Sequence, residues 1–148
     1  MIKSWHIAGD MRLVVDTSTI VAGFRSPRGA SAEILRLAHE GRITMLVSVG
    51  VFVEYEAVLK RPEHLAAAGL IAADVDKILD ALAVRAERVD IFFLWRPKLR
   101  DVDDDMVLEV AVNGNADCIV TFNVRDFAAM VPQFGIPALL PDDVLRRL

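Results

Sequence analysis

The chain has 148 residues, of which 54% are apolar and 26% charged, and its 17 basic and 21 acidic side chains give a net charge of −4. This length and composition fit one globular domain with a sizeable core and exclude a disordered chain. No apolar run approaches the roughly 20 residues that a membrane span requires. The single cysteine, Cys118, cannot form an internal disulfide, and no secretory signal is visible. We therefore expect a cytoplasmic protein without a membrane segment.

The first half of the chain predicts two strands, each followed by a helix. Residues 1–10 read as an irregular N-terminal extension, to which we assign no role. Apolar runs over residues 12–16 and 43–47 are typical of strands that are buried on both faces. Apolar positions at helical spacing over residues 34–38, and again from Ser48 to Arg61-Pro62, predict the two helices.

The second half continues the alternation. A helix with an apolar stripe is predicted over residues 75–86, capped by Asp74, and a short strand over 89–93. A helix over 104–113, a strand over 118–121, a short helix over 124–130, an edge strand over 136–140 and a final helical turn follow. This order predicts one domain over residues 11–148, a three-layer α/β/α sandwich with a parallel sheet of about five strands.

Acidic residues stand at four places where a parallel sheet could gather them. Asp16 ends the first strand, Glu54 lies inside an apolar helix, the run 101–105 contains four aspartates, and Asp126 follows the strand over 118–121. Each has a purely structural alternative: a helix cap, a solvent-facing helix edge, a solvated loop and a turn residue. Because ligands bind beyond the carboxyl ends of parallel strands, convergence there would create a site for Mg²⁺ or Mn²⁺. Such a site suits phosphoryl chemistry, for which an acidic centre is expected despite the lack of a basic excess.

These residues, in this order, resemble the PIN-domain nucleases from Met11 to Leu148. The resemblance is carried by Val14-Val15-Asp16-Thr17-Ser18, by Glu54 in the segment 53–62, by the aspartate run 101–105, and by the segment 116–127. Within that family, the chain is most similar to the toxin components of toxin–antitoxin systems, the relatives of VapC. The resemblance implies a PIN-like fold and metal-dependent hydrolysis of RNA phosphodiesters by water.

The resemblance also implies an acidic pocket of Asp16, Glu54, Asp104 and Asp126. Asp16, Asp104 and Asp126 would hold Mg²⁺ or Mn²⁺, and Glu54 or a pocket aspartate could take the proton of the attacking water. The further metal ligands that remain open are Asp101, Asp105 and Asn123, the last standing where many relatives carry an aspartate. The hydroxyls of Thr17, Ser18 and Thr121 would donate hydrogen bonds that orient the carboxylates or a water. The alternative is that they are ordinary hydroxyls of turns at strand ends.

The implied partners are an RNA substrate, a cognate antitoxin protein and a second copy of the chain. Among the basic residues that could form an RNA-binding rim, we favour Arg25, Arg28 and Arg125, since each closely follows a predicted site loop. The three histidines have no mutual spacing that suggests a metal site. A second hypothesis is a catalytically weak PIN-like module that binds RNA or protein, motivated by Asn123. A third hypothesis is a phosphotransfer receiver or a haloacid-dehalogenase-like enzyme, which would require a lysine after a late strand or a second aspartate two residues after the first. Ser18 and the segment Thr121-Phe122-Asn123 supply neither.

Overall fold

In the computed structural model, which describes residues 10–92, 102–128 and 131–148, five strands form one parallel sheet. This arrangement confirms the predicted fold class. Residues 1–9 of the predicted N-terminal extension lie outside the described residues. The strands are β1 (Arg12–Val15), β2 (Thr44–Val47), β3 (Glu87–Arg88), β4 (Cys118–Val120) and β5 (Ala138–Leu139), in the order β3-β2-β1-β4-β5.

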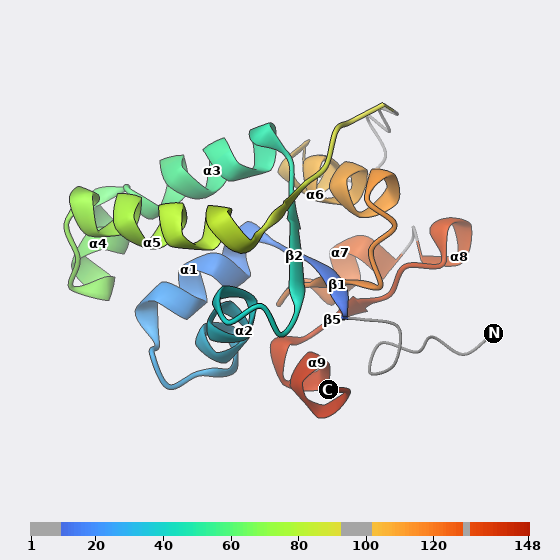
Figure 1. Cartoon of the computed structure of the whole chain (residues 1–148), viewed down its shortest axis with the longest axis horizontal. Coiled ribbons are helices and arrows are strands. Elements are labelled where there is room, and N and C mark those ends of the chain that lie inside the picture. Colours follow the sequence, from blue (N-terminus) through green and yellow to red (C-terminus); the bar gives the residue numbers. More distant parts are fainter. Residues whose placement is uncertain (1–9, 93–101, 129–130) are drawn as a thin grey trace.

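Helices cover both faces of the sheet, because connections between parallel strands are right-handed. The chain moves from β1 to β3 in one direction across the sheet and from β4 to β5 in the other, so the connecting helices lie on opposite faces. Figure 1 shows α1, α2, α4 and α5 on one side of β2, and α6 and α7 on the other. The helices are α1 (Thr17–Arg25), α2 (Ala30–His39), α3 (Val49–Leu59), α4 (Pro62–Ala68), α5 (Ala72–Arg85), α6 (Val102–Asn113), α7 (Val124–Ala128), α8 (Val131–Phe134) and α9 (Pro141–Arg146).

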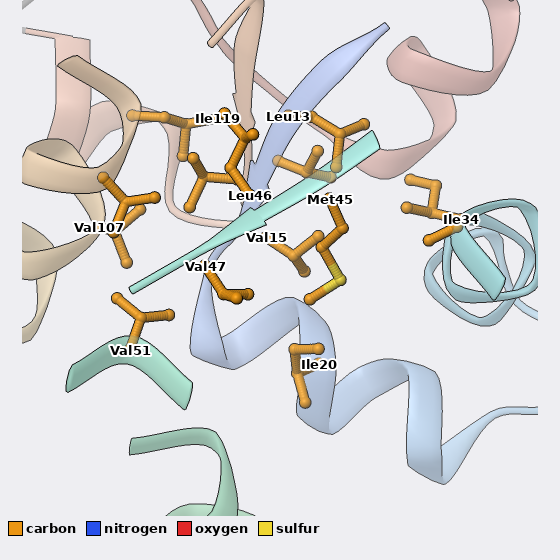
Figure 2. Close-up of a cluster of buried hydrophobic side chains, with 14 of the residues drawn as sticks. Leu13, Val15, Ile20, Ile34, Met45, Leu46, Val47, Val51, Val107 and Ile119 are labelled. Atoms are coloured by element: carbon orange, nitrogen blue, oxygen red, sulfur yellow. The ribbon is translucent and has the colours of Figure 1, made fainter. Parts of the chain in front are cut away.

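The hydrophobic core lies between the sheet and these two helical layers. In Figure 2, side chains of β1, β2 and β4 are packed between Val107 of α6 on one side and Ile20 and Ile34 of α1 and α2 on the other. All of these core side chains are buried. Burial on both faces explains why the strands read as continuous apolar runs rather than as alternating ones. None of the helices formed by the described residues is long and apolar enough to cross a membrane.

Two helices on the same face as α2 were not predicted. α1 begins directly after Asp16, where the run Thr17-Ser18-Thr19 obscures the helical pattern because small hydroxyl residues favour turns as much as helices. α4 is rich in alanine and contains no buried residue, so it carries no apolar stripe. The short α8 was also missed.

Several predicted boundaries also change. The strand predicted over 89–93 is β3 at Glu87–Arg88, whose exposed, charged residues at the sheet edge give no apolar signal. Asp74 does not occupy the N-cap of α5, which is Ile71. Its carboxylate instead accepts a hydrogen bond from the Ile71 amide at 3.0 Å, from the third helical position. β5 is shorter than the segment predicted for it, and residues 129–130 of the helix predicted over 124–130 lie outside the described residues.

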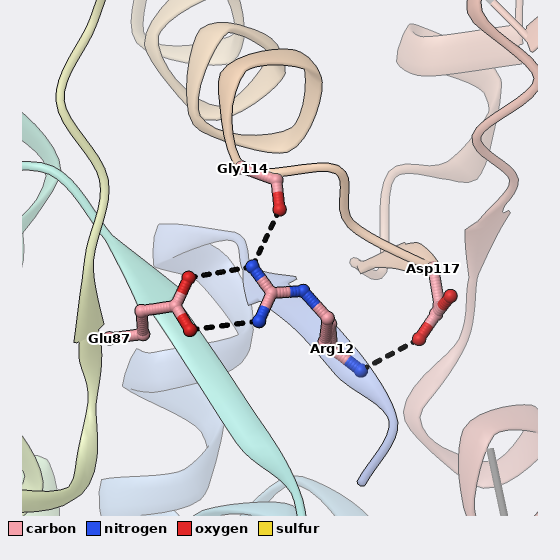
Figure 3. Close-up of polar contacts among 4 residues, drawn as sticks. All are labelled: Arg12, Glu87, Gly114 and Asp117. Carbon is pink, nitrogen blue, oxygen red and sulfur yellow. Dashed lines mark hydrogen bonds and ion pairs between the residues drawn. The ribbon is translucent and has the colours of Figure 1, made fainter. Parts of the chain in front are cut away.

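A polar cluster fastens the amino ends of three strands, at the edge where β1 begins. The guanidinium of Arg12 donates to both carboxylate oxygens of Glu87, at 2.8 and 2.6 Å, and to the carbonyl of Gly114 at 2.7 Å (Figure 3). The Arg12 amide donates to the carboxylate of Asp117 at 2.8 Å. Arg12 therefore connects β1 to β3, to the end of α6 and to the start of β4.

The ion pair between Arg12 and Glu87 should make part of the stability depend on pH. Hydrogen bonding to Arg12 holds the pKa of Glu87 below its ordinary value of 4.5. A lowered pKa in the folded state stabilises the protein above the ordinary pKa, and this contribution is lost as the pH falls through the folded-state value. We expect Glu87→Gln to lower the free energy of unfolding at pH 7 by about 0.2–1 kcal/mol, the range for a partly exposed pair.

Urea unfolding of both proteins at pH 7 and at stepwise lower pH checks this expectation. The difference in the free energy of unfolding between wild type and Glu87→Gln should become smaller as the pH falls below 4.5. Glu40→Gln is the matched control, because Glu40 lies 3.9 Å from Arg42 in an exposed pair that connects no strands. A difference between wild type and Glu87→Gln that does not change with pH would contradict the electrostatic explanation.

Candidate active site

At the centre of the sheet, the adjacent strands β1 and β4 are the point at which the strand order reverses. β1 lies between β2 and β4, and the connections from β1 and β4 lead toward opposite edges of the sheet. In open parallel sheets, the crevice beyond the carboxyl ends of the strands at such a point is where ligands bind. Val15 of β1 is in register with Val120 of β4. The next residues along the two strands are Asp16 and Thr121, so this pairing brings them together.

Hydroxyl groups fix the Asp16 carboxylate at this position. Asp16 is 5% exposed, and its Oδ2 accepts hydrogen bonds from the hydroxyls of Thr121 at 2.7 Å and Ser18 at 3.1 Å. The hydroxyl oxygen of Thr121 in turn accepts a hydrogen bond from the backbone N–H of Asn123 at 2.9 Å. Asp16 occupies the N-cap of α1, but its side chain makes no capping hydrogen bond. Backbone capping of α1 therefore does not account for the carboxylate, which is bonded instead by the side chains of Ser18 and Thr121.

Tyr55 ties the end of β1 to α3. Its hydroxyl donates to the carbonyl of Val15, and its side chain is completely buried. Burial, assisted by the negative charge of Asp16, raises the pKa of the Tyr55 phenol above its ordinary value of 10.0, so the phenol stays protonated and remains a donor. Glu54, the preceding residue of α3, is thereby held beside the end of β1.

A cavity of about 380 Å³ opens at this edge of the sheet and contains most of the predicted acids. Four separate segments contribute to its lining: the start of α1, the middle of α3 with the turn into α4, the first turn of α6, and the segment after β4. The lining residues are Asp16, Thr17, Ser18, Val21, Glu54, Val58, Arg61, His64, Asp103, Asp104 and Asn123. The cavity thus joins positions that are more than 100 residues apart in the sequence.

The structure separates the members of the aspartate run. Asp104 is 8% exposed and lines the cavity, together with the exposed Asp103. Asp105 is completely buried and does not line it, since successive helical residues point about 100° apart. Asp101 lies outside the described residues.

The other acid predicted for the pocket, Asp126, does not line the cavity. Asp126 is an exposed residue of α7, whereas Asn123, three residues earlier, does line it. The segment after β4 therefore presents an amide rather than a carboxylate to the site. Asn and Asp share a carbonyl-type oxygen, but the amide carries no charge.

The favoured RNA-binding arginines also lie elsewhere. Arg25, Arg28 and Arg125 are exposed, and none of them lines the cavity. Two of the described residues that line it are basic, Arg61 and His64 at the start of α4. One of these has a sequence signal, because Glu54, Val58 and Arg61 are spaced at i, i+4 and i+7, the spacing of a single helix face. The histidine has no such signal.

The donor set of the cavity suits a hard cation. Mg²⁺ and Mn²⁺ prefer oxygen ligands, and the carboxylates of Asp16, Glu54 and Asp104 with the amide of Asn123 offer them. Among the residues that the structure describes, no three His, Cys, Asp or Glu side chains are placed to hold one ion together. Mg²⁺ does not require such a cage, since it keeps several waters and is commonly bound by one or two carboxylates and substrate phosphates. The cavity fits a weakly held ion.

Comparisons with known proteins bear on the family and the fold of the chain. The PIN domain model matches residues 12–125. Among solved structures, one that resembles the chain is the crystal structure of VapBC2 from Rickettsia felis bound to a DNA fragment from their promoter. The identity is 18%, the TM-score is 0.58, and the likeness covers 88% of this chain and 98% of the other. No curated protein matches the sequence. Because the family model spans most of the chain, including the cavity-lining segments after β1, in α3, in α6 and after β4, this protein belongs to the PIN-domain family.

Proposed function

We propose that this protein is an endoribonuclease that hydrolyses RNA phosphodiesters with the help of Mg²⁺ or Mn²⁺. PIN domains are generally nucleases, and the chain belongs to that family. The observation that carries the proposal is the cavity at the carboxyl edge of the sheet, which four acids and an amide from four segments line together. A core of carboxylates is of little use to a protein that only binds RNA, since it repels the phosphates.

In the proposed reaction, Asp16, Asp104 and Asn123 hold the ion. When bound, the ion would stabilise negative charge that develops on the scissile phosphate. Asp16 is suited to the task because two hydroxyls orient its carboxylate in advance. Glu54 is partly exposed on the wall of the cavity, so its carboxylate can accept the proton of an attacking water. The positive end of the helix dipole stabilises the negative charge of Asp103 and Asp104, which lie in the first turn of α6.

A second candidate function is a catalytically weak module that binds RNA or protein. The observation that favours it is the replacement of an acid by Asn123 at the cavity, with Asp126 exposed outside it. A neutral ligand contributes less to the affinity for a cation than a carboxylate does. Cleavage assays separate this candidate from the nuclease.

We further propose that the nuclease acts as the toxin of a toxin–antitoxin pair and that it forms a homodimer. The similar solved structure is of the VapBC2 complex, and its likeness extends over nearly the whole of both chains. A toxin of this kind requires an antitoxin that restrains it in the cell. Large apolar side chains exposed on α3 and α5, Val53 at 57% and Val84 at 82%, support a protein partner on that side.

Among the tests of the proposed function, the first concerns Asp16. We expect Asp16→Asn to reduce cleavage of a single-stranded RNA at least about 100-fold in the presence of Mn²⁺ or Mg²⁺, because removing a preorganised electrostatic group typically costs this much. The measurement is the initial rate of cleavage of a labelled oligonucleotide, with EDTA added to a parallel reaction.

Asp80→Asn is the matched control, since Asp80 is an exposed acid on α5 that does not line the cavity. Equal activity of Asp16→Asn and wild type would overturn the metal-pocket hypothesis. Cleavage that is absent from the wild-type protein under all metal conditions would favour the binding module.

The second prediction concerns Thr121, the donor of the shorter hydrogen bond to Asp16. Thr121→Val keeps the branched shape but removes the hydroxyl. We expect activity at limiting Mn²⁺ to fall about 10-fold, since groups that orient metal ligands typically contribute 10–100-fold. Higher Mn²⁺ should restore part of the loss.

A titration of the cleavage rate against Mn²⁺ concentration measures this effect. Thr44→Val in β2 is the control, because Thr44 lies near the opposite end of the sheet. An unchanged Mn²⁺ dependence in Thr121→Val would show that the hydroxyl does not position the carboxylate for the metal.

The third prediction concerns assembly. We expect the purified chain to have twice its monomeric mass in light scattering at micromolar concentration. Val53→Lys and Val84→Lys, which place charges on the exposed apolar surface, should shift the mass toward the monomer. A monomeric wild-type protein at that concentration would contradict the proposed dimer.

A further inference from the structure

The turn between α3 and α4 places two basic side chains in the acidic cavity. α3 ends at Leu59, and the sequence Arg61-Pro62 starts α4, because proline is accepted at the first position of a helix but not within one. Arg61 and His64 both line the cavity that contains Asp16, Glu54 and Asp104. The Arg61-Pro62 sequence thus ends one helix and begins the next beside the cavity.

The Arg61 side chain is not used by the fold. Its neighbour Lys60 forms ion pairs with Glu56 at 2.9 Å and Asp76 at 2.6 Å, which fasten α3 to α5. Arg61 forms no ion pair with any residue that the structure describes, although it borders a cavity lined by acids. A guanidinium near several carboxylates that does not pair with them remains available to an anionic ligand.

His64 also carries an unused polar atom. Its Nδ1 is buried and has no hydrogen-bond partner among the described residues. His64 lines both the acidic cavity and a neighbouring, mostly apolar one, which Leu59 and Leu65 also line. A buried polar atom without a partner costs free energy, and in native proteins an ordered water, a bound ion or a functional role explains it.

We propose that Arg61 and His64 bind a backbone phosphate of the RNA substrate beside the carboxylates. An RNA strand that enters the cavity meets the repulsion of several acids, so the site needs fixed cationic or neutral donors next to them. The planar guanidinium of Arg61 can donate two parallel hydrogen bonds to phosphate oxygens, and the imidazole of His64 adds a donor from the first turn of α4. This inference rests on the proposed function, since it takes RNA as the substrate of the same cavity.

The alternative is that Arg61 only offsets the negative charge of the cavity and never touches RNA. A purely structural cation would affect stability and leave RNA affinity unchanged. A phosphate contact has a distinct signature, because each contact releases counterions and changes the salt dependence of binding. For single strands, the slope of log K against log salt is negative, and it becomes less steep by about 0.7 for each contact that is lost.

Binding is measured in the Asp16→Asn protein, in EDTA, so that cleavage does not interfere. The probe is a fluorescent single-stranded RNA oligonucleotide, and its anisotropy is followed at several salt concentrations. We expect Arg61→Ala to weaken binding about 10-fold, the effect of losing one charge-assisted hydrogen bond, and to make the salt slope less steep by about 0.7. His64→Ala should weaken binding by a smaller factor, and Arg61→Lys should retain part of the affinity and the full salt slope.

Matched controls are Arg42→Ala and His39→Ala, which remove exposed basic side chains at the amino edge of β2 and the end of α2. Both should bind RNA as the Asp16→Asn parent does. Thermal melts of every variant establish that the protein is folded, and Arg61→Lys provides a conservative change if Arg61→Ala does not fold.

The outcomes separate this inference from the proposed function. If the parent protein binds no RNA, or if Arg61→Ala and Arg61→Lys leave both affinity and salt slope unchanged, the inference is overturned even where the wild-type protein cleaves RNA. If the wild-type protein cleaves no RNA but binding depends on Arg61, the proposed nuclease activity fails and the phosphate contact stands.

Discussion

The parallel pairing of β1 with β4 is the constraint on which the site depends. The register Val15 to Val120 sets Asp16 beside Thr121, and the hydrogen bond between their side chains follows from that alignment. A slip of one residue would turn every side chain of the strand to the other face of the sheet and move Asp16 away from the crevice. Three hydrophobic residues of β1, all fully buried, oppose such a slip. The core thus specifies the position of a catalytic candidate.

The two ends of the sheet solve opposite electrostatic problems. At the amino ends, Arg12 is paired with Glu87, and its amide is bonded to Asp117, so charges are matched within the protein. At the carboxyl ends, carboxylates from three elements line one cavity. Like charges at close range raise one another's free energy, so positive or hydrogen-bonding groups stabilise this end of the sheet.

The turn from α3 to α4 gives the cavity a mixed character. Arg61 and His64 line the cavity beside the acids, and neither forms an ion pair with a described residue. Lys60 forms ion pairs with Glu56 and Asp76, which connect α3 to α5. A site with acids alone would favour a cation and repel an anionic strand. Acids together with a guanidinium and an imidazole can accept both, as phosphodiester chemistry requires.

The sequence by itself determined the alternation of strands and helices, because buried parallel strands and amphipathic helices leave strong periodic patterns. It also indicated Asp16 and Glu54 as candidates, since an acid at the end of a buried strand or in an apolar helix stands out locally, whereas the resemblance to PIN-domain nucleases selected Asp104 from its run. It did not reveal α1 or α4, where hydroxyl-rich and alanine-rich segments lack an apolar stripe. Nor did the sequence show that the Asp16 side chain makes no capping hydrogen bond and accepts hydrogen bonds from Ser18 and Thr121 instead.

Only the tertiary structure decided which side chains share the cavity. Asn123 lines it and Asp126 does not, although both follow β4 within a few residues. Arg61 and His64 line it, whereas Arg25, Arg28 and Arg125 do not. The reason is that the cavity is formed by the ends of segments brought together from distant parts of the chain. Sequence patterns report the environment of each segment, while the direction of a turn residue depends on how the segments pack.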